Sequence, residues 1–315
     1  MSEEIYILPF SKISKEDVDK AGGKGASLGE MIKIKIPVPP GFVILASAFQ
    51  RFIYENDIEV EIDKWIKKVD PKSIESVEEA SGVLRHIIKE SPMPKNLEEE
   101  IVNKFKKLKS PLVAVRSSAT AEDSKIDSWA GELESYLNTN KKTLLQNVRN
   151  CWASLFTPRA IFYRLERNMG GKKVLVAVVV QKMVQSEISG ICFTVHPVTK
   201  DEKQLIIEAG WGLGEAIVSG QITPDSYVID KRDFSILDIN IANQEKMIVK
   251  AASGNKWVTV PKNDQEKQKL TGKQIIEFSE LAAGIEKHYK SPQDIEWALE
   301  KGKFYVVQSR PITTL

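Results

Sequence analysis

Three side chains of the kind that bind metals and phosphates lie close together near the end of the sequence. Glu296 and Gln308 carry a carboxylate and an amide oxygen, which are hard ligands for magnesium, and Arg310 carries a guanidinium suited to a phosphate. A surface that held all three could bind a metal-bound polyphosphate. The alternative is a solvated sheet face with an ordinary ion pair, because such pairs are common and weakly stabilising.

Strand alternation predicts how these side chains come to share a face. Residues 294–310 have the pattern of two antiparallel strands joined by a short loop. We expect a three-residue loop, Lys301–Lys303, with its glycine in the left-handed conformation. The register that this loop implies consists of the pairs Glu300–Phe304, Trp297–Val307, Glu296–Gln308 and Asp294–Arg310.

Two further segments bring positive charge to turns. Ala21–Glu30 is rich in glycine, has Lys24 at its centre and leads into a short helix predicted over 26–32. Backbone N–H groups, a helix N-terminus and the ammonium could together bind an anion there. Arg116 follows a strand predicted over 112–115, at the carboxyl end where sheets of α/β proteins usually bind ligands. A plain glycine-rich loop and a solvated loop arginine are the respective alternatives.

The remaining motifs favour structural interpretations. No Gly-x-x-x-x-Gly-Lys-Ser/Thr string occurs in the sequence, so a P-loop is excluded. The glycine-rich segment Glu208–Glu215 does not fit the dinucleotide pattern, and a structural turn is the favoured interpretation. None of the three histidines has serine or cysteine chemistry around it. We expect His196 to form hydrogen bonds within its loop, with contact to a ligand as the alternative.

The elements that would position these residues suggest two lobes. Residues 18–108 are mostly helix-patterned, interrupted by a strand that ends near residue 45, and the chain becomes rich in strands after residue 185. Thr271 and Gln274 form a capping box before a helix. The pattern predicts an α+β protein, with further helices over 144–156 and from 158, strands over 174–180, 190–194 and 204–208, and a hairpin over 227–237.

Composition excludes several classes of protein. With 315 residues, 42% of them hydrophobic, the chain can bury the core of about two domains. Its 45 basic and 43 acidic residues nearly balance, so we expect no nucleic-acid partner. Cys151 and Cys192 have apolar neighbours and suit a reducing compartment. The N-terminus is acidic and the longest apolar run, residues 174–180, is too short for a membrane span, so we expect a cytoplasmic protein without a membrane partner.

Nine motifs, taken in order, resemble one family over essentially the whole chain. The sequence is similar to the N-terminal ATP-binding domain of the phosphoenolpyruvate synthase and pyruvate phosphate dikinase family. Rifampicin phosphotransferase, of the same superfamily, resembles the ending Gln308–Thr314 especially well. The motifs are Gly23–Met31, Val38–Phe42, Ala114–Asp123, Ala130–Gly131 with Tyr136–Asn138, Trp152–Phe156, Ser189–Phe193, Gly212–Glu215, Gln293–Trp297 and Gln308–Pro311.

The resemblance implies an ATP-grasp fold, in which two lobes enclose the nucleotide. Residues 1–185 would form the N-terminal lobe with the phosphate-binding loops, and residues 186–315 the C-terminal lobe with a magnesium-binding hairpin. The resemblance implies ATP and Mg²⁺ as cofactors and assigns the following roles: Lys24 and Arg116 at the phosphates, the backbone of Gly131 and the hydroxyl of Ser135 at the nucleotide, Gln181 at the adenine, Glu296 and Gln308 at the metal, and Arg310 at the transferring phosphoryl group.

The sequence departs from the family pattern in three places. Ser135 stands where threonine is expected, which keeps the hydroxyl, and His196 stands where aspartate or asparagine usually precedes the proline. In the family, the phosphoryl group passes first to a histidine in a Thr-Ser/Thr-His-Ala type motif on a swivelling domain. No such motif occurs in this sequence.

The resemblance therefore implies one part of a dikinase-type phosphotransferase. It would phosphorylate a histidine on a separate swivelling domain and work with an acceptor-binding domain, both on another chain or region. The overall reaction would convert ATP, pyruvate and water to AMP, phosphoenolpyruvate and phosphate. Rifampicin is the alternative acceptor, and a nucleotide-binding module without turnover is the alternative from another class. An ATP-grasp ligase would need a carboxylate-substrate site that we do not find.

Overall fold

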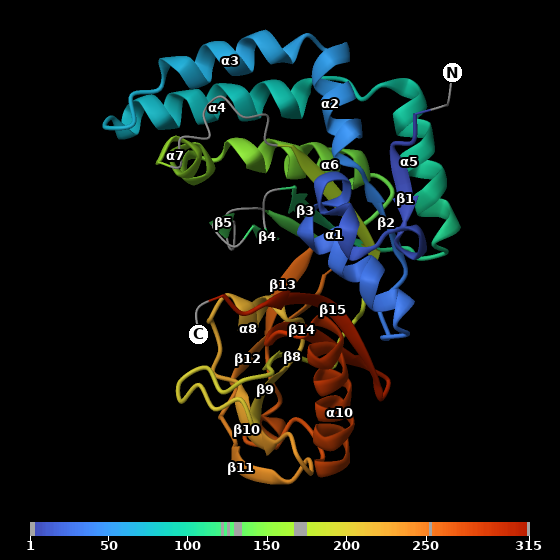
Figure 1. Cartoon of the computed structure of the whole chain (residues 1–315), viewed down its shortest axis with the longest axis vertical. Helices are drawn as coiled ribbons and strands as arrows, with labels where there is room; N and C mark the ends of the chain where they lie inside the picture. Colours follow the sequence, from blue (N-terminus) through green and yellow to red (C-terminus); the bar gives the residue numbers. More distant parts are fainter. Residues whose placement is uncertain are drawn as a thin grey trace. The chain divides into compact units, whose positions relative to one another are not determined.

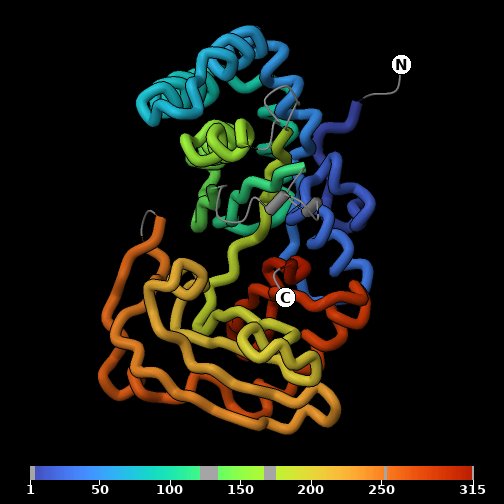
Figure 2. Tube along the Cα trace, turned by 60° about the vertical axis from the view of Figure 1, so that its left-hand side comes forward, coloured from blue at the N-terminus to red at the C-terminus, as the bar shows by residue number. Residues whose placement is uncertain are grey.

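The computed structural model describes residues 4–120, 123–124, 127–128, 134–166, 175–251 and 254–313. Contacts within the chain divide it into two units (Figures 1 and 2). The first unit is made of Met1–Gly29 and Pro40–Met183, and the second of Glu30–Pro39 and Val184–Leu315. One crossing between the units thus lies between residues 183 and 184, whereas the sequence pattern predicts a division near residue 185.

The second unit also contains residues 30–39, which their place in the sequence would assign to the N-terminal lobe. Two contacts attach this segment. The backbone N–H of Val306 donates to the carbonyl of Pro37 at 2.9 Å. The carboxylate of Glu30 lies 2.7 Å from Nε2 of His288. Interactions distant in sequence decide this assignment, so a local pattern could not predict it.

The first unit contains a five-stranded antiparallel sheet with the order β1-β2-β7-β3-β6. Helices Ala46–Glu55 and Leu144–Ala153 pack against one face of the sheet, and Trp152 stacks there on Phe49 with ring centroids 5.4 Å apart. The strands are β1 Ile7–Pro9, β2 Gly41–Ile44, β3 Val113–Ala119, β6 Ser135–Thr139 and β7 Val176–Lys182. Helix α1, Val18–Lys33, belongs to this unit up to Gly29 and to the second unit from Glu30. The other elements are η1 Phe10–Lys12, η2 Lys15–Asp17, α2 Ala46–Glu55, α3 Ile58–Lys68, α4 Ile74–Glu90, α5 Lys95–Lys107, α6 Leu144–Ala153, η3 Ser154–Phe156, α7 Pro158–Glu166 and the short pair β4 Asp123–Ser124 and β5 Asp127–Ser128.

Strand β3 is longer than the sequence predicts, and Arg116 lies inside it rather than in a loop after it. The hydroxyls of Ser117 and Ser118 allow the strand to continue. Ser117 Oγ donates to the carbonyl of Glu134 at 2.8 Å, and Ser118 Oγ donates to the carbonyl of Ala21 at 3.0 Å. Because these polar groups are satisfied while buried, residues 116–119 pair with β7 instead of forming a turn.

Helix α1 also begins earlier than predicted, at Val18, and it is interrupted at Gly22. Gly22 has φ 67° and ψ 169°, a conformation that is essentially restricted to glycine. A Cβ at this position would clash with the backbone of Ser118 in β3. The glycine therefore lets α1 approach β3 closely, and Lys24 lies in the first turn of the helical segment after the interruption.

The second unit contains a six-stranded antiparallel sheet with the order β11-β10-β9-β8-β14-β15, drawn from yellow to red in Figure 2. Helix α10, Gly272–Tyr289, covers one face, where Phe278 packs against Trp297 and Phe304 at ring-centroid distances of 5.0 Å. Its capping box of Thr271 and Gln274 is present as predicted. The other elements are β8 Ile188–Phe193, β9 Gln204–Trp211, α8 Glu215–Val218, β10 Asp225–Asp230, β11 Ile236–Asn240, the pair β12 Lys246–Lys250 and β13 Asn255–Thr259, α9 Lys262–Gln265, β14 Gln293–Glu300 and β15 Lys303–Pro311.

The hairpin of β14 and β15 corrects part of the predicted register and confirms the rest. Its loop has two residues, Lys301 and Gly302, both with positive φ, so the expected three-residue loop is wrong. An extra residue in β15 shifts the register back by one position between Trp297 and Glu296. The observed pairs are Glu300–Lys303, Leu299–Phe304 and Trp297–Val306 before the shift, and the predicted Glu296–Gln308 and Asp294–Arg310 after it.

Among the helices that the structure describes, none combines the length and apolar character needed to cross a bilayer.

Candidate functional site

Three of the predicted nucleotide-binding residues share one face of the first unit's sheet. Arg116 lies directly opposite Ser135 in the pairing of β3 with β6, and it lies opposite Val179 in the pairing with β7. Gln181 is two residues beyond Val179, so it projects from the same face. The helical core packs against the other face, which carries Val115 and its partner Val180.

Lys24 belongs to the helix that packs on this same face. The backbone N–H of Gly25 donates to Ser118 Oγ at 3.2 Å, and a Cβ on Gly25 would meet the side chain of Val43 at 3.0 Å. Val43 pairs with Val179, which lies opposite Arg116. Helix α1 therefore brings an ammonium group to the sheet face of Arg116. We call Lys24, Arg116, Ser135 and Gln181 the cationic face.

Burial on the cationic face differs from residue to residue. Arg116 is 8% exposed and Gln181 is 2% exposed, whereas Ser135 is exposed. The side-chain Nε2 of Gln181 is buried and forms no hydrogen bond with any residue that the structure describes. A buried donor without a partner costs free energy unless a ligand or water accepts a hydrogen bond from it. Gly131, also predicted at the nucleotide, lies outside the described residues.

The second unit carries its predicted residues on the sheet face that points away from α10. Glu296 pairs with Gln308 on one side and with Ile191 on the other, and Ile191 pairs with Glu208. Asp294 and Arg310 form the next pair along the same face. Trp297, which alternates with Glu296, points instead toward Phe278 of α10. We call Glu208, Asp294, Glu296, Gln308 and Arg310 the carboxylate face.

Charges crowd the carboxylate face. Nε and Nη2 of Arg310 donate to Oδ2 of Asp294 at 2.8 and 2.7 Å. Oδ1 of Asp294 is buried and has no hydrogen-bond partner among the described residues. Burial raises the pKa of Asp294, Arg310 opposes this rise, and Glu296 adds to it. Burial also raises the pKa of Glu208, and the charge of Asp294 raises it further. A cation bound at this face would relieve the repulsion.

The carboxylate face has donors that fit magnesium shared with phosphates. Glu296 and Gln308 lie directly opposite each other on neighbouring strands, so their Cβ atoms are roughly 4.5–5.5 Å apart. Magnesium is commonly held by one or two protein oxygens together with phosphate oxygens and water. Within the described part of the chain, no three His, Cys, Asp or Glu side chains are placed to hold a metal ion by themselves.

Comparison with known families places the chain in one of them. A family model described as the AMP/ATP-binding domain of pyruvate phosphate dikinase matches residues 18–315. The chain belongs to this family. The predicted resemblance and the α+β, ATP-grasp-type fold are therefore confirmed.

Several curated relatives of this dikinase domain are archaeal proteins. A probable phosphoenolpyruvate synthase of Methanocaldococcus jannaschii is 45% identical over 98% of this chain and 27% of its own length. A probable phosphoenolpyruvate synthase of Archaeoglobus fulgidus is 44% identical over 98% of the chain and 42% of its own length. The phosphoenolpyruvate synthase of Pyrococcus furiosus is 40% identical over 98% and 44% respectively. The chain thus spans less than half the length of each of these relatives.

Two carboxylates of the carboxylate face, Asp294 and Glu208, were not among the site residues predicted from the sequence. Asp294 is predicted only as the partner of Arg310, and Glu208 only as the end of a strand before a structural loop. The available signal was strand alternation: Glu208 lies in the same row as Glu296 across β9, β8 and β14. Recognising it requires the order of the strands, which the sequence does not state.

His196 accepts hydrogen bonds within its own loop. Its Nδ1 accepts the backbone N–H groups of Val198 and Thr199, each at 3.2 Å. An aspartate or asparagine at this position makes the same kind of turn. The predicted hydrogen-bonding role of His196 within its loop is confirmed.

The glycine-rich segment Glu208–Glu215, whose first four residues belong to β9, has structural contacts, as the favoured interpretation expects. Gly212 has φ 90°, and its carbonyl accepts the hydroxyl of Ser189 at 2.7 Å. Trp211 Nε1 donates to the carbonyl of Asp264 at 3.0 Å. These bonds attach the loop to elements of its own unit.

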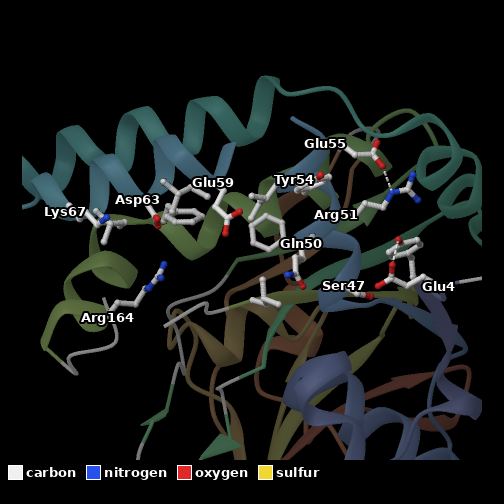
Figure 3. A pocket seen from close by; sticks show the side chains of 17 residues that line it. Glu4, Ser47, Gln50, Arg51, Tyr54, Glu55, Glu59, Asp63, Lys67 and Arg164 are labelled. Carbon is white, nitrogen blue, oxygen red and sulfur yellow. Dashed lines mark hydrogen bonds and ion pairs between the residues drawn. The ribbon is translucent and has the colours of Figure 1, made fainter. Parts of the chain in front are cut away.

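A cavity of about 810 Å³ in the first unit lies elsewhere, beside α2, α3 and α7 (Figure 3). None of the predicted nucleotide-binding residues that the structure describes lines it. Four carboxylates in its wall disfavour a polyphosphate, so we do not place the nucleotide there. The charged residues of the wall are Glu4, Glu55, Glu59, Asp63, Arg51, Lys67 and Arg164.

Proposed function

We propose that this chain binds Mg–ATP and transfers a phosphoryl group from it to a histidine on another domain. The complete reaction would convert ATP, pyruvate and water to AMP, phosphoenolpyruvate and phosphate. One observation carries the proposal: Arg116, Ser135 and Gln181 share a single sheet face, against which the helix of Lys24 packs. That set combines two cations with hydroxyl and amide donors, as recognition of a nucleoside triphosphate requires.

Each face has its own part in the proposed reaction. Lys24 and Arg116 hold phosphate oxygens, Gln181 donates its buried amide hydrogen to the adenine, and Ser135 and the backbone of Gly131 complete the contacts to the nucleotide. Glu296 and Gln308 hold Mg²⁺, which supplies neutralisation of phosphate charge when bound. Arg310 leaves Asp294 to contact the phosphoryl group as it transfers. Phosphoryl transfer needs little more from the protein than this positioning and charge neutralisation.

The acceptor histidine belongs in this proposal to a separate domain. Each of the three histidines of this chain has another setting: His86 is on α4, His196 caps its loop, and His288 pairs with Glu30. The relatives named phosphoenolpyruvate synthase are more than twice as long as this chain, which leaves room for a swivelling domain and an acceptor-binding domain. Pyruvate is the proposed acceptor, and rifampicin remains the alternative.

The compartment is part of the proposal as well. Cys151 and Cys192 are both free and buried. Burial raises the pKa of each thiol, so both remain protonated. Free thiols fit a reducing compartment, and we place the reaction in the cytoplasm.

The proposal is tested by mixing the purified chain with Mg–ATP and the His-bearing domain of the Methanocaldococcus jannaschii relative. We expect acid-labile phosphohistidine on that domain together with release of AMP and phosphate, because the histidine takes the two terminal phosphoryl groups of ATP and water then removes the outer one. The matched control is the same domain with its acceptor histidine changed to alanine. ATP binding without phosphohistidine on the active domain would favour a nucleotide-binding module without turnover, and absence of ATP binding would contradict the proposal entirely.

A further inference from the structure

Glu134, which directly precedes β6, is held by its side chain in two directions. Oε1 accepts a hydrogen bond from Nη2 of Arg85 on α4 at 2.8 Å. Oε2 accepts the phenolic hydrogen of Tyr136. Burial raises the pKa of Tyr136 and the hydrogen bond to Glu134 raises it further, so the phenol remains a donor. Each oxygen of the carboxylate therefore has its own fixed donor.

The backbone of Glu134 is attached to β3 next to Arg116. Its carbonyl accepts both the N–H of Ser117 at 3.2 Å and the hydroxyl of Ser117 at 2.8 Å. The thiol of Cys151 approaches the same carbonyl at 3.8 Å. Glu134 is thus anchored to α4 through its side chain and to β3 through its main chain.

This double attachment determines where Ser135 points. Glu134 and Tyr136 contact each other, so their side chains lie on one side of the strand, and Ser135 between them projects to the other side. The opposite strand places Arg116 directly across from Ser135. A rotation of the chain at Glu134 would therefore move the hydroxyl of Ser135 away from the guanidinium of Arg116.

We infer that Arg85 is a positioning residue for nucleotide binding: by holding Glu134, it keeps the Ser135 hydroxyl beside Arg116 on the cationic face. The inference rests on the proposed function, because it concerns the same nucleotide site. Arg85 acts through Glu134, without contact to the nucleotide. The side chains of Arg85 and Glu134 are 28% and 32% exposed, and ion pairs with such exposure contribute little to global stability. Positioning and stability can therefore be separated by experiment.

The test measures the Kd of Mg–ATP by calorimetry for the wild-type chain, Arg85→Gln, Glu134→Gln and the double variant. We expect each single variant to bind about tenfold more weakly, because the start of β6 is released. The double variant should bind no more weakly than the singles, because both substitutions break one network. Arg85→Lys should recover part of the affinity. Hydrogen exchange in a peptide covering residues 134–139 should accelerate in both single variants while the melting temperature changes little.

The matched control is Glu55→Gln, which breaks another arginine–carboxylate pair of the first unit, the one between Arg51 and Glu55 at 2.6 Å. It should bind Mg–ATP like the wild type. The inference is overturned if Glu134→Gln binds within twofold of the wild type, or if the losses of the two single variants multiply in the double variant. Absence of Mg–ATP binding by the wild-type chain would instead contradict the proposed function itself, so the two failures are distinguishable.

Discussion

The two sheets of this chain offer a phosphate opposite kinds of surface. The cationic face of the first unit combines Lys24 and Arg116 with neutral donors, whereas the carboxylate face of the second unit places three carboxylates around one arginine. A phosphate can bind the first surface directly. On the second, the three carboxylates require a cation between them and the phosphate, and Arg310 can contact a phosphate only by leaving Asp294. In the proposed function, one chain thus combines direct binding of a polyphosphate with binding through a metal ion.

The two arginines show the same contrast. Arg116 is 8% exposed within the sheet, between β7 and β6. The side chain of Arg310 is 44% exposed on the edge strand β15, and it donates two hydrogen bonds to one oxygen of Asp294. A buried arginine is oriented in advance for a phosphate, whereas Arg310 must exchange a carboxylate for one. We therefore expect substitutions on the two faces to have different signatures.

The largest effect is expected from removing the proposed metal ligands. Glu296→Ala and Gln308→Ala should each lower phosphoryl transfer to the histidine domain on the order of 10³-fold, because transition-state charge loses its counter-ion. The fold should persist, because both residues lie on the sheet face that points away from α10 and neither belongs to the apolar core beneath that helix. Phosphohistidine formation under single-turnover conditions is the measurement.

Glu280→Ala, an exposed carboxylate on α10, provides the matched control and should transfer like the wild type. Wild-type rates in both ligand variants would sink the assignment of the metal to the hairpin of β14 and β15.

A smaller effect, on binding rather than transfer, is expected from the cationic face. Arg116→Ala should weaken Mg–ATP roughly 100-fold, the range expected for losing charge-assisted hydrogen bonds to phosphate. The dependence of binding on free Mg²⁺ should keep its wild-type form. Arg51→Ala, which removes an arginine paired with Glu55, is the control. If ATP binding by Arg116→Ala depended differently on free Mg²⁺ than binding by the wild type, the proposed separation of roles between the two faces would be wrong.

The next effect concerns the glycine that lets α1 pack on the cationic face. Gly22→Ala should destabilise the chain by roughly 2 kcal/mol or more, because alanine disfavours the observed φ and ψ and its Cβ meets the backbone of Ser118. Weaker Mg–ATP binding should accompany the loss of stability, since Lys24 follows two residues later. Urea unfolding and calorimetry measure both quantities.

Gly82 on α4 is the comparison for Gly22, because it has helical geometry and nothing within 4 Å of an added Cβ. Gly82→Ala should stabilise the chain by about 1 kcal/mol. Equal stability of Gly22→Ala and the wild type would contradict the role given to this glycine.

The smallest effect comes from Glu208, whose pKa is raised in the folded chain. An acid with a raised pKa binds its proton more readily when folded, so acidification through that pKa should stabilise the native state. Glu208→Gln removes this contribution. On going from pH 7 to about 5, the free energy of unfolding should rise for the wild type and rise less for Glu208→Gln. The difference between the two rises should be less than about 1 kcal/mol, because Glu208 is partly exposed. If the free energies of unfolding of the wild type and Glu208→Gln changed in parallel with pH, Glu208 would not be coupled to the other charges of the carboxylate face.

The hairpin shows how far the sequence could predict this site. The loop length was wrong, yet Glu296 still faces Gln308, because an extra residue in β15 compensates for the shorter loop. The shorter loop and the extra residue in β15 compensate for each other, so the alternation of apolar and polar residues shows neither of them. The polar matching of Asp294 with Arg310 was the stronger signal, since a mismatch would bury charges against apolar side chains.

The first unit shows what could not be predicted locally. Arg116 was expected after a strand because serines and a threonine follow it. The hydroxyls of Ser117 and Ser118 instead donate hydrogen bonds to carbonyls distant in the sequence, and the strand continues to Ala119. The role of Gln181 at the adenine was predicted only from the resemblance to a family. A glutamine at the end of a buried run of valines does not by itself indicate a binding residue. The contact of Arg85 with Glu134 spans 49 residues and depends on the packing of α4, which composition and spacing do not encode.

In the proposed function, Lys24 and Arg116 bind phosphate directly, whereas Glu296 and Gln308 bind it through Mg²⁺. Calorimetric titration of ATP against the wild-type chain, Arg116→Ala and Glu296→Ala over a range of free Mg²⁺ tests this most directly. We predict that the affinity of the wild-type chain for ATP rises with the concentration of free Mg²⁺. Arg116→Ala should bind ATP more weakly at every Mg²⁺ concentration but show an equally steep rise, whereas Glu296→Ala should lose most of the rise. A Glu296→Ala profile parallel to that of the wild type would contradict the claim.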